Sequence, residues 1–194
     1  MTVKTSNFSY PRITINLQGW INECTQIHSP HFNERSDITD ISLLVIHNIS
    51  LPPNRYGGNY ITDLFMGQLD PAEDPYFENI YKMEVSSHFL IRRTGEIIQY
   101  VSLFSRAWHA GKSYFDGREN CNDFSIGIEL EGTDTDPYTD NQYSSLITLT
   151  EAIRSKFPRI TKKRITGHCN IAPERKTDPG ESFNWNFYLN HLSN

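Results

Sequence analysis

The chain has 194 residues, which is typical of one domain, and its 37% hydrophobic and 21% charged residues are ordinary for a globular protein. The net charge is −5 and no long basic run is present, which argues against nucleic acid or an anionic membrane as a main partner. We therefore expect a single domain, residues 1–194, with enough chain to bury a core without disulfides or a structural metal.

Three cysteines, Cys24, Cys121 and Cys169, are too few for a disulfide framework and indicate free thiols in a reducing compartment. The first 20 residues lack the apolar core of a signal peptide, and no window approaches about 18 consecutive apolar residues. These features predict a cytoplasmic protein without a transmembrane helix. Residues 1–40 are polar, and we expect a less regular N-terminal segment that packs on the domain.

The first regular elements follow this segment. The apolar, β-branched run ISLLVIHNIS, residues 41–50, stops at LPPNRYGG and predicts a buried central strand that runs into a loop. Residues 59–69 have apolar side chains at helical spacing, and residues 70–82 predict a loop with a short helical turn. Ser87–Arg93 and Glu96–Val101, which flank Thr-Gly, predict a hairpin.

The second half of the chain alternates between irregular and regular patterns. Residues 102–123 show no apolar period and predict a long loop, a feature that is usually functional in a compact domain. Phe124–Leu130 predicts another apolar strand. Thr139 and Gln142 fit a capping box in front of an amphipathic helix that ends before Pro158.

Two short elements complete the pattern: a strand that begins at Ile165 and a helix over residues 182–192. Strands and helices thus alternate without repeats or linkers. This order predicts a mixed α/β fold in which a central mixed β-sheet is flanked by α-helices.

The segment GHCNIAPERKTDPG, residues 167–180, contains His168, Lys176 and Asp178 but little apolar content, and it fits neither a helix nor a simple strand. His47 ends the apolar strand LLVIH, where a side chain meets a cleft. Two imidazoles and a carboxylate are typical of a catalytic zinc site with an open fourth position. The spacing alone is a weak signal, because a single histidine is more often structural or exposed than a metal ligand.

Glu129 and Lys176 add two candidate groups. Glu129 lies within the apolar strand FSIGIEL, where a carboxylate is costly unless it is paired or its pKa is raised, and a raised pKa suits a proton shuttle. The alternative is an outward-facing or salt-bridged glutamate. Lys176 comes two residues before Asp178, so an extended backbone directs both side chains to one side, where an ammonium can stabilise an oxyanion. The alternative for Lys176 is a solvated loop lysine.

Five stretches together carry a resemblance to a known family: HNISLPPNRYGG, SHFLIRRTGEIIQYV, RAWHAG, CNDFSIGIELEGTD and GHCNIAPERKTDPG. The chain resembles the zinc-dependent N-acetylmuramoyl-L-alanine amidases, which are related to a phage lysozyme and to peptidoglycan recognition proteins, and within them the AmpD type. The resemblance implies one Zn²⁺ held by His47, His168 and Asp178. It also implies that Glu129 is the catalytic acid and base and that Lys176 stabilises the oxyanion.

The resemblance implies a reaction and a substrate as well. The substrate is a small molecule, an anhydro-muropeptide, and the cleaved amide joins the lactyl group of 1,6-anhydro-N-acetylmuramic acid to L-alanine. The role is peptidoglycan recycling in the cytoplasm, with an indirect effect on β-lactamase induction, and we expect a monomer. Two competitors stay open: a zinc-free module that only binds muropeptides, and an autolysin or endolysin that cleaves polymeric wall.

The resemblance also places seven residues in or near the substrate cleft: Asn48, Tyr76, His88, Trp108, His109, Arg118 and Ala172. Trp108 is expected to stack on a sugar face and Arg118 to pair with a peptide carboxylate; the alternatives are a packed loop aromatic and a surface arginine. The chain departs from the family pattern at Glu84 and Asn120, where the AmpD type has arginines. Peptide carboxylates would then need other basic groups, such as Arg118 or Lys112.

Overall fold

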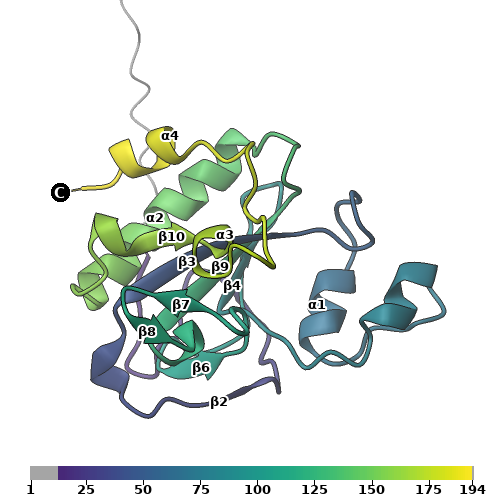
Figure 1. The fold of residues 1–194 in the computed structure, drawn as a ribbon, viewed down its shortest axis with the longest axis horizontal. Coiled ribbons are helices and arrows are strands. Elements are labelled where there is room, and N and C mark those ends of the chain that lie inside the picture. The colour runs from purple at the N-terminus through teal and green to yellow at the C-terminus, as the bar shows by residue number, and fades with distance from the viewer. Residues whose placement is uncertain (1–12, 194) are drawn as a thin grey trace, which may run out of the picture.

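A computed structural model describes residues 13–193, so the first twelve residues of the expected N-terminal segment lie outside the described part (Figure 1). A mixed sheet of six strands forms the centre of the fold. One pair of neighbouring strands, β4 (Phe89–Ile91) and β5 (Ile97–Gln99), is antiparallel, and the other four pairs are parallel. The strand order is β1 (Thr25–Gln26), β5 (Ile97–Gln99), β4 (Phe89–Ile91), β9 (Ser125–Glu131), β3 (Leu43–Ile49) and β10 (Ile165–Gly167). The expected mixed α/β fold is confirmed.

The two central strands are β3 and β9, which pair in parallel over seven residues each. Both are buried on both faces for most of their length, which explains why they read as continuous apolar runs in the sequence. The predicted strands at 41–50 and 124–130 and the predicted hairpin are therefore confirmed. Parallel pairing brings the carboxyl ends of β3, β9 and β10 to the same edge of the sheet.

Helix α2 (Asp140–Lys156) covers one face of the sheet, and Figure 1 shows it together with α4 (Trp185–Asn190) on that side. Its N-terminus carries the predicted capping box, since the Thr139 side chain accepts from the Gln142 backbone and the Gln142 side chain from that of Thr139. The even-numbered apolar side chains of β3 and β9 join α2 in the main core cluster. The side chains at odd-numbered positions, which include His47 and Glu129, lie on the opposite face of the sheet, away from α2.

Helix α1 (Tyr60–Phe65) is shorter than the predicted 59–69. Met66 caps it and Gly67 follows in the left-handed region, at φ +67°, a common way to end a helix. The expected turn in the next loop is the 3₁₀ helix η2 (Pro75–Asn79). Apolar residues of both elements join Tyr100 in a second core cluster on the side of the sheet that α2 does not cover.

The polar stretches hold more structure than the sequence pattern predicts. The expected long loop at 102–123 contains β6 (Ser105–Ala107), the hairpin of β7 (Tyr114–Phe115) and β8 (Arg118–Glu119), and the 3₁₀ helix η3 (Cys121–Asp123). The N-terminal segment supplies η1 (Ile38–Asp40), the sheet-edge strand β1, and β2 (Phe32–Glu34), which pairs with β6. All of these strands have only two or three residues, so they leave no period in the sequence, and β1, β2 and β6 also depend on backbone pairing with distant segments.

The segment 167–180 is only partly irregular, because α3 (His168–Ile171) forms one helical turn directly after β10, and this corrects the expectation of no helix there. The 3₁₀ helix η4 (Lys162–Arg164) precedes β10. All three cysteines are free thiols, as expected. Within residues 13–193, none of the helices has both the length and the hydrophobicity that crossing a membrane requires.

Candidate metal centre and substrate cleft

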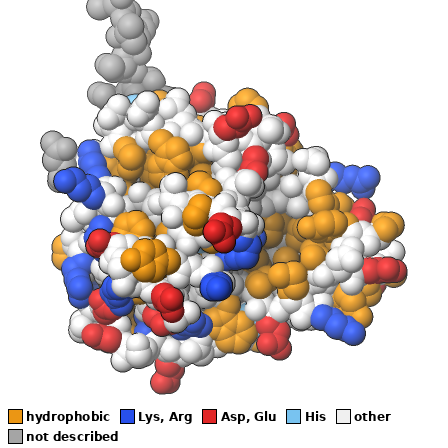
Figure 2. Space-filling model, in the orientation of Figure 1, with side chains coloured by type: hydrophobic (Ala, Val, Ile, Leu, Met, Phe, Trp, Pro, Cys, Tyr) orange, Lys and Arg blue, Asp and Glu red, His pale blue; other side chains and the backbone are white. Residues whose placement is uncertain are grey.

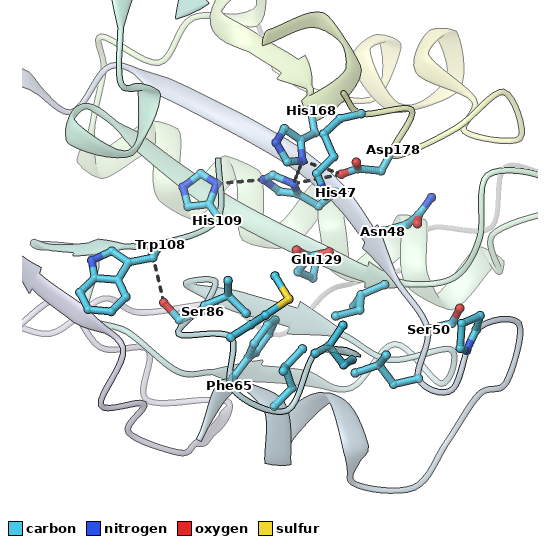
Figure 3. Close-up of a pocket in the computed structure, with 18 of the residues that line it drawn as sticks. His47, Asn48, Ser50, Phe65, Ser86, Trp108, His109, Glu129, His168 and Asp178 are labelled. Carbon is cyan, nitrogen blue, oxygen red and sulfur yellow. Dashed lines mark hydrogen bonds and ion pairs between the residues drawn. The ribbon is translucent and has the colours of Figure 1, made fainter. Parts of the chain in front are cut away.

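Three side chains meet at the edge where β3 and β10 end (Figure 3). The Nδ1 atoms of His47 and His168 lie 3.0 Å apart, and each is 3.1 Å from Oδ2 of Asp178. The three donor atoms therefore form a nearly equilateral triangle. All three residues are buried.

The fold explains how His47 meets His168 and Asp178, which lie 121 and 131 positions later in the sequence. His47 lies in β3, and His168 directly follows β10, whose Gly167 pairs with Ile46. The backbone N–H of Cys169 donates to the carbonyl of Asp178 at 2.9 Å, which folds the loop back onto α3. Parallel register and one loop-closing hydrogen bond thus bring the three side chains together.

The donor set fits a metal cation. His168 Nε2 lies 3.1 Å from the carbonyl oxygen of Ala110, which can only accept, so a neutral His168 directs its Nδ1 lone pair at the triangle. Burial lowers the pKa of His47 to about 4. Burial alone would raise the pKa of Asp178, but its contacts with His168 and His47 hold it below its ordinary value. Lone pairs and a carboxylate crowded at this distance need a positive charge between them, and tetrahedral ligands with bonds of about 2.0–2.1 Å lie roughly 3.3 Å apart.

Glu129 stands beside this triangle. It is the Cα partner of His47 in the parallel register of β3 and β9, and only 8% of its surface is exposed. Burial and the charge of Asp178 raise its pKa well above the ordinary value. Its Oε2 has no hydrogen-bond partner within residues 13–193. An unsatisfied buried carboxyl with a raised pKa is a recurring feature of proton-transfer sites.

Lys176 approaches the same cleft from the loop between α3 and Asp178. Its backbone N–H donates to the Ala172 carbonyl at 3.0 Å, and its side chain is half-buried and lines the cleft beside Glu129. The structure therefore brings together all five residues that the sequence singled out for chemistry.

A cleft of about 370 Å³ opens in front of the triangle. One wall is apolar, and Figure 2 shows hydrophobic side chains gathered on that side of the face, over the region of α1. A second groove of about 470 Å³ continues from the triangle, and its walls are polar and charged. The apolar wall consists of Leu51, Leu64, Phe65, Ile80, Met83 and Val85.

Four of the seven expected substrate residues line this cleft: Asn48, Tyr76, Trp108 and His109. Asn48 donates from Nδ2 to Oδ1 of Asp134 at 2.8 Å, which fixes its amide at the junction of the two grooves. Tyr76 is 42% exposed, so its ring is open to a ligand. The indole of Trp108 lies beside Ser86, whose hydroxyl accepts from the Trp108 backbone at 3.1 Å (Figure 3).

The other three expected substrate residues lie elsewhere. His88 is fully buried, and its Nδ1 accepts from the backbone of Gly127 at 3.0 Å. Arg118 forms a bidentate pair with Asp40 and lies over the Phe124 ring, so its charge is already matched. Ala172 lines a separate hollow that also contains Lys112. Sequence spacing could not show that Asp40 reaches Arg118 across 78 positions.

Several cleft features were not expected from the sequence. Most of the apolar wall, namely Leu51, Ile80, Met83 and Val85, comes from segments without a hydrophobic period, and only Leu64 and Phe65 come from the predicted helix α1. The position of Trp108 depends on the N-terminal segment, because Asn33 Oδ1 accepts from its indole Nε1 at 2.6 Å and His31 stacks against it. These partners lie 75 and 77 positions away, and no local signal could have found them.

Comparison with known proteins identifies the fold and the chemistry. The family described as N-acetylmuramoyl-L-alanine amidase matches residues 37–181. The chain belongs to this family. As an amidase it is a hydrolase, and the matched range includes the whole His47, His168 and Asp178 triangle, Glu129 and Lys176.

Individual amidases are similar over most of their length. The 1,6-anhydro-N-acetylmuramyl-L-alanine amidase AmpD of Haemophilus influenzae is 58% identical over 175 residues, which cover 90% of this chain and 95% of that protein. A crystal structure of a selenomethionine AmpD derivative superposes with a TM-score of 0.88 at 55% identity, over 91% of this chain and 98% of that one. AmiD from Escherichia coli, solved with anhydro-N-acetylmuramic acid-L-Ala-D-γ-Glu-L-Lys, has a TM-score of 0.58 at 26% identity and covers 93% of this chain and 65% of its own.

Proposed function

We propose that this amidase hydrolyses the bond between the lactyl group of 1,6-anhydro-N-acetylmuramic acid and L-alanine in peptidoglycan turnover fragments, with one Zn²⁺ at the triangle of His47, His168 and Asp178. The observation that carries the proposal is the register pair of His47 and Glu129, which places a protonatable carboxyl beside a three-donor metal centre. The similarity to AmpD over nearly the whole of both chains supports the choice of substrate.

The ligand set supports zinc as the metal. Two imidazole nitrogens and one carboxylate oxygen are a common set for catalytic zinc, and they leave one position open. When bound, zinc supplies a Lewis acid that polarises a carbonyl and makes water a better nucleophile at neutral pH. The remaining steps belong to side chains of this chain.

Glu129 is the proton carrier in the proposed reaction. Its carboxylate takes a proton from the attacking water and later gives it to the leaving amine of L-alanine. Burial raises its pKa well above the ordinary value, so its carboxylate is a stronger base towards water than that of an exposed glutamate. The Lys176 ammonium, on the same cleft, stabilises the negative charge that develops on the carbonyl oxygen.

The cleft suits a small amphipathic substrate. The indole of Trp108 and the apolar wall offer surfaces for a sugar ring and its acetyl group, while the adjoining polar groove contains Asp134 and Arg175 for the peptide. We place the reaction in cytoplasmic wall recycling, with the protein acting as a monomer. Three free thiols among the described residues fit a reducing compartment.

One mass-spectrometric assay tests the proposal. The purified protein is incubated with 1,6-anhydro-N-acetylmuramyl tripeptide, with and without a zinc chelator, and free tripeptide is followed. A parallel sample receives polymeric peptidoglycan. Release from the soluble fragment that stops on chelation and returns with Zn²⁺ is expected. An intact fragment beside cleaved polymer would move the protein to the wall-degrading amidases, and two intact substrates would favour a binding module.

A further inference from the structure

His109 lines the cleft, and the sequence places it among substrate-binding residues, yet its ring has no free nitrogen. Nδ1 lies 2.9 Å from Nε2 of His47, and Nε2 lies 3.2 Å from Oγ of Ser125 (Figure 3 shows the first contact). The His109 backbone N–H donates to Oδ1 of Asn122 at 3.1 Å, so the residue is also fixed at its main chain. Both ring nitrogens therefore contact other side chains of the protein, and neither is free to bind a substrate.

The strand below leaves room for this ring. A Cβ on Gly127 of β9 would lie 2.5 Å from Cγ of His109, far inside van der Waals contact. Only glycine lets the imidazole lie this close to the sheet. On the other side the ring meets His47 edge-on, with centroids 5.0 Å apart. His109 is thus wedged between β9 and a ligand of the candidate metal centre.

The hydrogen-bond directions follow from the donor atom of His47. A neutral imidazole carries one N–H, so a His47 that offers the Nδ1 lone pair to a metal has its proton on Nε2. That Nε2–H donates to Nδ1 of His109, which must then be unprotonated. The proton of His109 is on Nε2 and is donated to Oγ of Ser125. These contacts are compatible with only one tautomer of His47 and one of His109.

We propose that His109 is a positioning residue: with Ser125, it holds His47 in the tautomer and orientation that present Nδ1 to the metal. The Ala110 carbonyl fixes the tautomer and orientation of His168 in the same way. Partners of this kind typically change metal affinity by 10–100-fold. The inference rests on the proposed metal centre but not on the choice of substrate.

Zinc affinity, measured by competition with a chelating dye, tests the proposal without turnover. His109→Phe keeps a ring of similar shape but removes both nitrogens, and we expect about 10–100-fold weaker binding. His109→Asn returns an acceptor, Oδ1, near the position of Nδ1 and is expected to recover part of the loss. His191→Phe makes the same substitution at an exposed histidine of the C-terminal region and is expected to bind zinc like the wild type.

Ser125→Ala is the milder variant should His109→Phe fail to fold, and it is expected to weaken zinc binding in the same direction. ¹⁵N NMR of the zinc-loaded protein reads the tautomer directly, and His109 is expected to carry its proton on Nε2. A proton on Nδ1, or wild-type affinity in both His109→Phe and Ser125→Ala, overturns the inference and leaves the metal centre in place. A wild-type protein that binds no zinc overturns the metal centre itself.

Discussion

His47 and Glu129 are direct neighbours across the parallel pairing of β3 and β9. The side chains of both point to the sheet face opposite α2, one towards the donor triangle and the other into the cleft. A slip of one residue between the strands would move one of them to the apolar face, where the main core cluster lies. The packing of that core therefore also fixes the distance between the candidate metal centre and Glu129, its proposed proton carrier.

Replacing Glu129 with glutamine should separate chemistry from metal binding. The variant keeps the size of the side chain but cannot carry the proton, so we expect kcat to fall by about 10²–10⁴-fold. Zinc content should stay near one per chain, because Glu129 is not among the three donors. Turnover close to the wild-type rate would remove Glu129 from the mechanism.

The same substitution should stabilise the metal-free protein at neutral pH. The folded-state pKa of Glu129 is raised, so its stabilising protonated form is present in full below the ordinary value of 4.5 and is lost as pH rises through the folded pKa. Glutamine has no proton to lose. The difference in Tm between Glu129→Gln and wild type should therefore widen as the pH rises above 4.5, and thermal melts over a pH series measure it. A constant difference would show that Glu129 is not perturbed.

Removing Asp178 should remove the metal. Asp178→Ala leaves two imidazoles, and the purified variant is expected to contain far less than one zinc per chain by elemental analysis. Asp116→Ala is the matched control, because that exposed carboxylate pairs only with Arg164 among the described residues and lies outside the cleft. A full zinc complement in Asp178→Ala would show that the ligand assignment is wrong.

Two glycines with equal backbone angles offer a controlled test of the loop that carries Asp178. Gly180 and Gly117 both have φ of +81°, so alanine costs each about 1–2 kcal/mol of backbone strain. A Cβ on Gly180 would also lie 2.1 Å from Cα of Asp134, whereas Gly117 faces only the Tyr114 hydroxyl at 3.9 Å. This overpacking should lower the folding stability of the Gly180→Ala variant by a further amount of about 1–3 kcal/mol.

Denaturant unfolding of the two variants measures this difference. Gly180→Ala is also expected to weaken zinc binding, since its clash displaces the backbone two residues after Asp178. Gly117→Ala should bind zinc normally. Equal losses of stability in the two variants would contradict the close approach of Gly180 to Asp134.

The position of Trp108 should depend on Asn33. Asn33→Leu removes the acceptor for the indole N–H, a contribution of about 1 kcal/mol, so KM for the anhydro-muropeptide should rise about fivefold with little change in kcat. Asn33→Asp keeps an acceptor and should stay close to wild type. Tryptophan fluorescence should shift in the leucine variant alone. A fall in kcat without a change in KM would place Trp108 in the chemical step instead.

The local sequence pattern was sufficient to predict the long helix and the long strands. The strands at β3 and β9 and the capped helix α2 each have enough residues to show a period or an apolar run, because each buries a continuous face. The short strands β1, β2 and β6 have no such signal, and their pairing partners lie more than 70 positions away. Arg118 shows the same limit, since its partner Asp40 is set by packing and not by spacing.

The sequence by itself indicated the kind of chemistry through two histidines, an aspartate, a glutamate in an apolar strand and a nearby lysine, and its resemblance to the amidase family predicted their roles. Residue types carry this information because ligand and proton-transfer properties belong to individual side chains. The tertiary structure decided which atoms meet. It showed that His109 contacts His47 instead of open solvent and that His88 lies below the cleft, because strand register and side-chain rotamers depend on contacts between distant segments.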